Sequence, residues 1–148
     1  MTDFKETDTA DFIPNPKPKP NHYLDEEFWG HCADGILCFQ CCLDCETWRH
    51  IPRFMCAHCG SDRWGWRQSH GRGELYTWTV CHMPMSPEFE TECPYAVLVV
   101  EMEEGVRMTA GLKGMDYREL SIGLPMEVVF EPLKEGGKLP FFQPRSDK

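Results

Sequence analysis

The chain has 148 residues, of which 41% are hydrophobic and 26% charged, as expected for one ordinary folded domain or two very small ones. Its formal net charge of −9 argues against a protein that grips nucleic acid through its overall field. No apolar stretch approaches the roughly 18 residues that cross a bilayer, and the acidic start, MTDFKETDTADF, lacks the pattern of a secretory signal. We therefore expect a cytoplasmic protein that binds neither membranes nor nucleic acid.

The first segments along the chain are a tail and a short helix. Residues 1–20 end in FIPNPKPKP, where alternating proline and lysine favours a disordered, extended tail. Residues 21–35 predict a helix, because the apolar residues Leu24, Phe28 and Cys32 recur at four-residue spacing and Gly35 is placed to end it. The aromatic residues Phe28 and Trp29 are large for so short an element. They either cover the core of their own domain or dock on a partner protein, and both interpretations stay open.

Residues 36–70 contain the strongest chemical signal in the sequence. Two Cys-x-x-Cys pairs, CLDC and CAHC, are separated by ten residues. Each two-residue gap lets a tight turn direct both sulfurs at one ion, so two such turns complete a tetrahedral shell. The four predicted ligands, which leave no open position for hydrolytic chemistry, are Cys42, Cys45, Cys56 and Cys59. The spacing predicts one structural zinc ion in a zinc ribbon.

Three alternatives to this zinc site remain open at this point. Cys41 lies beside Cys42 and would give a Cys-x3-Cys pair, and His58 lies inside the second turn. Iron could replace zinc in a four-thiolate site, as in a rubredoxin-like electron carrier, although the short spacer favours zinc. The remaining cysteines have no matched partner and are expected to be small buried residues: Cys32, Cys38, Cys81 and Cys93.

Residues 71–148 predict a β domain. Five segments alternate in hydrophobicity or are rich in β-branched and aromatic residues: GRGELYTWTVCH, PYAVLVVEME, GVRMTAGL, PMEVVFEPL and KLPFFQP. A single helical turn, within MDYRELSIGLP, is expected between the third and fourth segments. Five short strands with one short helix at that position predict a small closed barrel of the OB type. The expected fold class is therefore mostly β.

The order of these motifs resembles the DUF35 family from about residue 22 to residue 144. The similar segments are the helix with FW, CLDC, IPRFMCAHCGS, GRGELYTWTV, PYAVLVVEMEEG, IGLPMEVVF and LPFFQP. The resemblance implies a rubredoxin-like zinc ribbon followed by an OB fold. It also implies a non-catalytic subunit that joins a thiolase-like catalytic subunit in a hetero-oligomer and supports assembly and acyl-CoA handling.

The resemblance extends to a subfamily and to a ligand. The chain is similar to the zinc-finger subunits of degradative thiolases. One of these is the subunit of the thiolase that acts on benzoylsuccinyl-CoA in anaerobic toluene breakdown. CoA carries phosphates, for which arginine is the expected contact. Arg53 is the first candidate because it matches the family's Pro-Arg step, and Arg49 and Arg72 follow. Two positions depart from the family pattern: Glu46 stands where many members have glycine, and Gln143 where arginine is frequent.

Two other classes of function compete with this interpretation. An OB barrel with exposed Tyr76 and Trp78 could bind single-stranded nucleic acid by stacking. The barrel segment, however, holds eight basic and thirteen acidic residues, the reverse of a groove that follows phosphates. The sequence shows no paired acid and base and no nucleophile motif, so we expect no catalysis from this chain alone.

Overall fold

The computed structural model describes residues 23–134 and 136–146, so the predicted tail at 1–20 lies outside the described residues. One α-helix comes first, followed by eight strands and two short 3-10 helices. In chain order they are α1 (Tyr23–Ala33), β1 (Cys38–Cys42), β2 (Trp48–Arg49), β3 (Trp64–Gln68), β4 (Arg72–Cys81), η1 (Pro87–Phe89), β5 (Tyr95–Met102), β6 (Arg107–Leu112), η2 (Tyr117–Glu119), β7 (Pro125–Pro132) and β8 (Lys138–Pro144). Within the described residues, no helix has the length and apolar character needed to cross a membrane.

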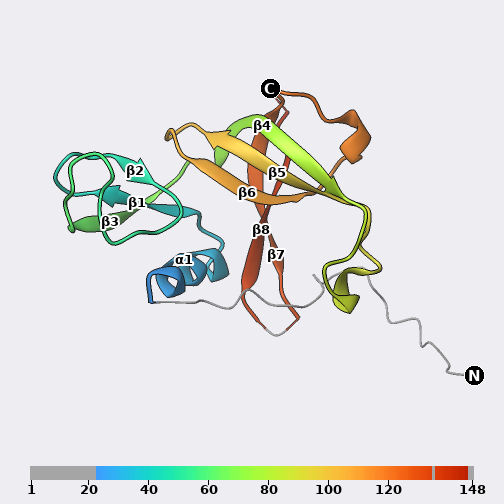
Figure 1. Ribbon diagram of the computed structural model, residues 1–148, viewed down its shortest axis with the longest axis horizontal. Helices are drawn as coiled ribbons and strands as arrows, with labels where there is room; N and C mark the ends of the chain where they lie inside the picture. The colour runs from blue at the N-terminus through green and yellow to red at the C-terminus, as the bar shows by residue number, and fades with distance from the viewer. Residues whose placement is uncertain (1–22, 135, 147–148) are drawn as a thin grey trace, which may run out of the picture.

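Helix α1 ends where glycine was predicted to end it. Gly35 has a φ of 74°, a left-handed conformation that glycine adopts without steric cost, and its N–H donates to the carbonyl of Cys32. The predicted apolar stripe, Leu24, Phe28 and Cys32, is buried. The helix packs against β1 of the ribbon and β8 of the barrel, and therefore bridges the two parts of the chain (Figure 1).

The ribbon is a three-stranded antiparallel sheet in the order β2-β1-β3. Strand β1, with the sequence CFQCC, is buried along its whole length because it lies in the centre of this sheet. Its last residue, Cys42, pairs with Trp64 at the start of β3. The sheet thus places the first cysteine of the CLDC pair at the end of a fixed central strand.

The barrel contains the five strands that the sequence predicted. The strands form a closed barrel in the order β4-β5-β6-β8-β7 (Figure 1). β6 and β8 pair in parallel, and the other neighbouring strands pair antiparallel. The predicted helical turn is present as η2, between the third and fourth barrel strands. The prediction of a mostly β chain with an N-terminal helix, a four-cysteine ribbon and a five-stranded OB-like barrel is confirmed.

A single hydrophobic core runs through the helix, the ribbon and the barrel. Phe28 from α1 and Phe39 from β1 belong to the same buried cluster as Leu98, Met126 and Phe142 of the barrel. Burying side chains of this size contributes roughly 1.5–3 kcal/mol each to the folded state. The ribbon is therefore held against the barrel by shared packing, which fixes the position of the ribbon relative to the barrel and to α1.

Candidate metal centre and the cavity beside it

The four predicted zinc ligands lie together in space. The sulfurs of Cys42, Cys45, Cys56 and Cys59 all lie within 4.8 Å of one another. The Sγ atoms of Cys42 and Cys59 are 3.6 Å apart, and those of Cys45 and Cys56 are 3.5 Å apart. A tetrahedron with metal–sulfur bonds of about 2.3 Å has edges of about 3.8 Å, so these thiols fit a zinc ion. The cluster could hold a metal ion with four soft ligands and no open position.

Two equivalent turns present these sulfurs. In the first turn the N–H of Glu46 donates to the carbonyl of Cys42, and in the second Gly60 donates to Cys56 in the same way. Gly60 has a φ of 76° and Glu46 a φ of 61°, so both turns need a left-handed residue at this point. Glycine adopts that conformation freely, whereas for glutamate the left-handed conformation costs about 1 kcal/mol of conformational free energy. The departure from the family pattern at Glu46 therefore leaves the shape of the turn unchanged.

The electrostatics of the cluster favour a bound cation. N–H groups of Cys45 and Asp44 donate to the sulfur of Cys42 and lower its pKa to about 6. The N–H of Ser61 acts the same way on Cys59, but burial and the neighbouring cysteine sulfurs raise the pKa of Cys59 to about 12. Four thiolates at this spacing repel one another strongly unless a positive ion lies between them. The arrangement is therefore suited to a divalent metal.

The two alternative ligands lie outside this cluster. Cys41 is fully buried, and its thiol donates to the carbonyl of Glu46 at 3.3 Å. His58 does not belong to the group of potential metal ligands found among the described residues. Cys32 and Cys38 are buried as expected, whereas Cys81 and Cys93 are only half-buried.

The three arginines predicted to contact CoA have different surroundings. Arg49 donates from Nε to the buried Gln40 Oε1 at 2.8 Å and from Nη2 to the carbonyl of Arg53 at 2.9 Å. The N–H of Arg53 donates to the same Gln40 oxygen at 2.7 Å. Arg49 thus shapes the loop after β2, and the exposed Arg53 is displayed by that loop. Arg72, at the start of β4, lies 3.8 Å from Glu103 in an exposed ion pair.

The two other ribbon arginines are also paired with local acids. Arg63 lies 2.7 Å from Asp44, and Arg67 lies 3.5 Å from Glu46. Exposed pairs of this kind contribute about 0–1 kcal/mol each. Arg63 and Arg67 thus form ion pairs, and the side chain of Arg49 is hydrogen-bonded to Gln40. Among the described residues, the side chain of the fourth ribbon arginine, Arg53, has neither kind of contact.

The two aromatic residues of α1 are placed differently from each other. Phe28 is 5% exposed and its ring centroid lies 5.1 Å from the rings of both Trp29 and His50. Phe28 therefore packs inside this chain and does not project outward as an anchor for a partner. Trp29 is half-buried and retains a surface that another molecule can reach.

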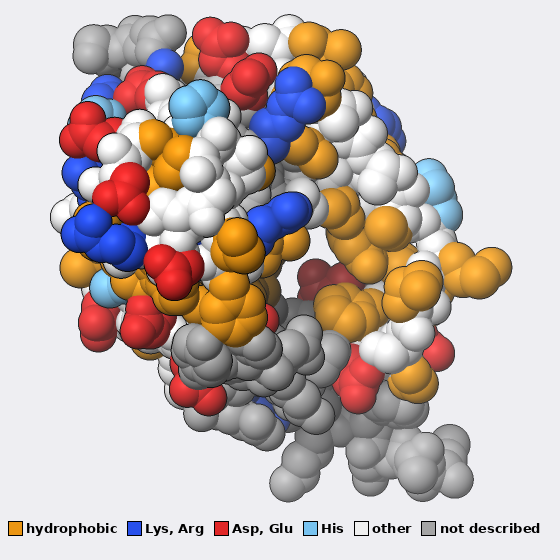
Figure 2. Space-filling model, turned by 60° about the vertical axis from the view of Figure 1, so that its left-hand side comes forward, with side chains coloured by type: hydrophobic (Ala, Val, Ile, Leu, Met, Phe, Trp, Pro, Cys, Tyr) orange, Lys and Arg blue, Asp and Glu red, His pale blue; other side chains and the backbone are white. Residues whose placement is uncertain are grey.

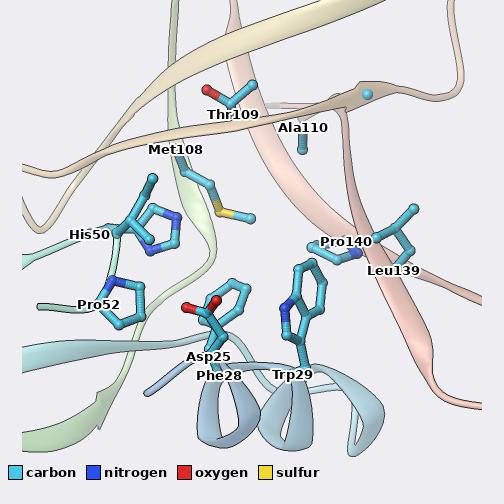
Figure 3. A pocket seen from close by; sticks show the side chains of 12 residues that line it. Asp25, Phe28, Trp29, His50, Pro52, Met108, Thr109, Ala110, Leu139 and Pro140 are labelled. Carbon is cyan, nitrogen blue, oxygen red and sulfur yellow. The ribbon is translucent and has the colours of Figure 1, made fainter. Parts of the chain in front are cut away.

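Sequence reasoning missed a cavity at the meeting point of helix, ribbon and barrel. It has a volume of about 290 Å³ and is lined by Asp25, Phe28 and Trp29 of α1, by residues 50–52 of the ribbon, by residues 108–111 of β6 and by residues 139–140 of β8. No local motif marks these positions, because they come together only when the three parts of the chain pack. In Figure 3 the side chains of Phe28, Trp29, Met108 and Pro140 surround the open space.

Comparison with known proteins agrees with this architecture. Residues 66–131 match the family described as ChsH2, C-terminal OB-fold domain. A DUF35 domain-containing scaffold protein of Methanocaldococcus jannaschii is 31% identical over 108 residues, which cover 72% of this chain and 73% of that protein. The chain belongs to the DUF35 family.

Two further matches are to proteins whose names include an enzyme activity. A chain in a solved structure described as Ltp2-ChsH2(DUF35) aldolase superposes with a TM-score of 0.78 and 32% identity, covering 85% of this chain and 98% of that one. A probable enoyl-CoA hydratase alpha subunit of Thermomonospora curvata is 36% identical over 129 residues. That match covers 86% of this DUF35 chain but only 40% of the relative's length.

Proposed function

We propose that this chain is a non-catalytic scaffold subunit of an acyl-CoA enzyme complex, with one structural zinc ion in its ribbon. The observation that carries the proposal is the match along nearly the whole length of a DUF35 chain in the Ltp2-ChsH2(DUF35) aldolase structure. The relative from Thermomonospora curvata, named as a hydratase subunit, supports the same chemistry of CoA thioesters. The four thiols would persist in the reducing cytoplasm, where we place the protein.

We further propose that the catalytic partner is a thiolase-like enzyme of a degradative pathway, with benzoylsuccinyl-CoA as the substrate to be tested first. The names of the relatives support acyl-CoA chemistry in general and include hydratase and aldolase subunits. Arg53 is the candidate contact to a CoA phosphate, because it is exposed beside the ribbon and its charge is not neutralised by an ion pair in the described part of the chain.

The test is purification of the tagged chain from its native host, followed by identification of the proteins that elute with it. We expect an acyl-CoA enzyme in a fixed ratio to this chain. The complex is then assayed for thiolysis, hydration and aldol cleavage of CoA thioesters, each with and without this chain. Thiolysis that is lost on removal of this chain supports the thiolase proposal. Elution with a ribosomal or replication protein would overturn the proposed function.

Weak binding to nucleic acid is expected from the same charges. The barrel carries a net charge of −5, from eight basic and thirteen acidic residues. Tyr76, one of the exposed aromatic residues, already stacks under Arg107, whose Cζ lies 3.8 Å from its ring centroid. Single-stranded DNA or RNA should bind only weakly at physiological salt in an anisotropy titration. Submicromolar binding would place nucleic-acid recognition ahead of the scaffold function.

A further inference from the structure

The cavity between α1, the ribbon and the barrel has the size of a binding site for one aromatic ring system. Its volume is about 290 Å³, and an apolar cavity of about 150 Å³ already accommodates benzene. The cavity is partly open to solvent. Figure 2 shows a hollow in this face of the molecule with hydrophobic side chains along its border. Because β6 and β8 are barrel strands and α1 packs on β8, three of the four wall segments belong to the hydrogen-bonded and packed framework of the fold. The fourth segment is the ribbon loop at residues 50–52.

Apolar side chains make up most of the cavity wall, and three polar residues, Asp25, His50 and Thr109, interrupt it. Asp25 and His50 line the space together with Trp29 and Met108 (Figure 3). The Nδ1 atom of His50 is buried and has no hydrogen-bond partner among the described residues. Burial lowers the pKa of His50 to about 4, although Asp25 acts in the opposite direction, so the imidazole is neutral at pH 7. Because Nδ1 has almost no accessible surface, it does not select the occupant. The Asp25 carboxylate at the wall accepts hydrogen bonds and favours an occupant that carries an N–H or O–H donor.

The surface around the cavity indicates a protein as the source of that occupant. Ile51 lines the cavity and is 62% exposed, and in the same ribbon loop Phe54 is 44% and Met55 59% exposed. A small molecule inside the cavity would leave this apolar surface in water, whereas a protein would cover it. The loop also displays Arg53, an exposed cation without an ion pair in the described part of the chain, although the chain is strongly acidic overall. An apolar surface with an acidic rim is its complement.

We infer that the cavity receives an aromatic side chain, tryptophan or tyrosine, from the catalytic subunit of the complex. The inference rests on the proposed function and differs from the docking interpretation that the sequence left open, in which Phe28 and Trp29 enter the partner. Trp29 and Phe28 form the receptor, and the partner supplies the anchor. Aromatic anchors that enter a pocket near the centre of an interface contribute most of its binding energy. The apolar ribbon loop and Arg53 then form the surrounding contact.

The experiment fills the cavity and leaves the rest of the surface unchanged. Ala110 lines the cavity from β6, and in Figure 3 its side chain points toward the open space. Ala110→Phe should weaken association with the purified catalytic subunit at least tenfold. Ile122→Phe, at a position that is 76% exposed and does not line the cavity, is the matched control and should bind like the wild type. Circular dichroism and zinc content verify that both variants fold.

A second measurement uses only the wild-type, zinc-loaded chain. The Met108 methyl group lines the cavity and is assigned by its loss from the spectrum of Met108→Leu. Indole should shift this methyl signal at millimolar concentration, and indene, which lacks the N–H, should shift it less. In the complex with the catalytic subunit, the ring of the anchor should shift the same signal upfield.

The outcomes separate this inference from the proposed function. If no acyl-CoA enzyme elutes with the chain, the proposed function fails and the docking inference falls with it. If the enzyme elutes but Ala110→Phe binds it normally, only the docking inference is overturned. An indole shift together with normal binding of Ala110→Phe would make the cavity a small-molecule site. If Ala110→Phe does not fold, an unchanged Met108 signal in the wild-type complex overturns the inference.

Discussion

Replacing one metal-cluster cysteine with serine is expected to reduce zinc from about one ion per chain to a small fraction and to unfold the ribbon. The four positions are Cys42, Cys45, Cys56 and Cys59. Structural zinc contributes roughly 10–16 kcal/mol of apparent binding free energy in small zinc domains, and most of it becomes folding free energy. The ribbon has three short strands and shares a core with the barrel, so its loss should also destabilise the barrel. Metal analysis and thermal unfolding measure both effects.

The matched control for these variants is Cys81→Ser. Cys81 is half-buried at the end of β4 and does not belong to the cluster, so zinc content should stay at about one per chain. Retention of zinc after loss of one cluster cysteine would mean that another residue, such as Cys41, replaces it. Stoichiometric iron and visible colour in protein from the native host would contradict zinc and favour an electron carrier.

The features that the sequence predicted correctly depend on local spacing. Cys-x-x-Cys pairs form turns by themselves, and Gly35, which was expected to end the helix, has a positive φ. The barrel strands were predictable because alternation and β-branched runs report which face is buried. Strand order was accessible only through the OB pattern, in which one short helix separates the third and fourth strands. Local signals therefore predicted the metal cluster and the fold class together.

The features that the sequence could not predict depend on contacts between distant segments. The stripe that includes Leu24 and Phe28 indicated a buried helix face, but it could not show whether the covering surface belongs to this chain or to a partner. The cavity has the same origin, since its walls come from four separate elements. Arg49 illustrates the problem for single side chains: its contact with Gln40 joins residues of β1 and β2 that carry no common motif. Such positions become interpretable only after the ribbon is placed on the barrel.

The two aromatic residues of α1 should separate stability from association. Phe28→Ala removes a side chain that is 5% exposed and shared by the helix, the ribbon and the barrel core. Truncation at such a site costs about 3–5 kcal/mol, so thermal unfolding should begin roughly 10 °C lower. Trp29→Ala removes a half-buried ring at the cavity wall, which should cost less stability and weaken binding of the catalytic subunit.

Zinc content is the internal control for both variants, because Phe28 and Trp29 lie outside the metal cluster. Folded Phe28→Ala at low temperature should therefore contain about one zinc per chain. Melting curves by circular dichroism, combined with co-purification of the catalytic subunit, distinguish the two roles. If Phe28→Ala melts like the wild type but loses its partner, the ring leaves the core to act as an anchor on the catalytic subunit. If Trp29→Ala binds normally, the cavity wall contributes nothing to the interface, since its largest accessible side chain has been removed without effect.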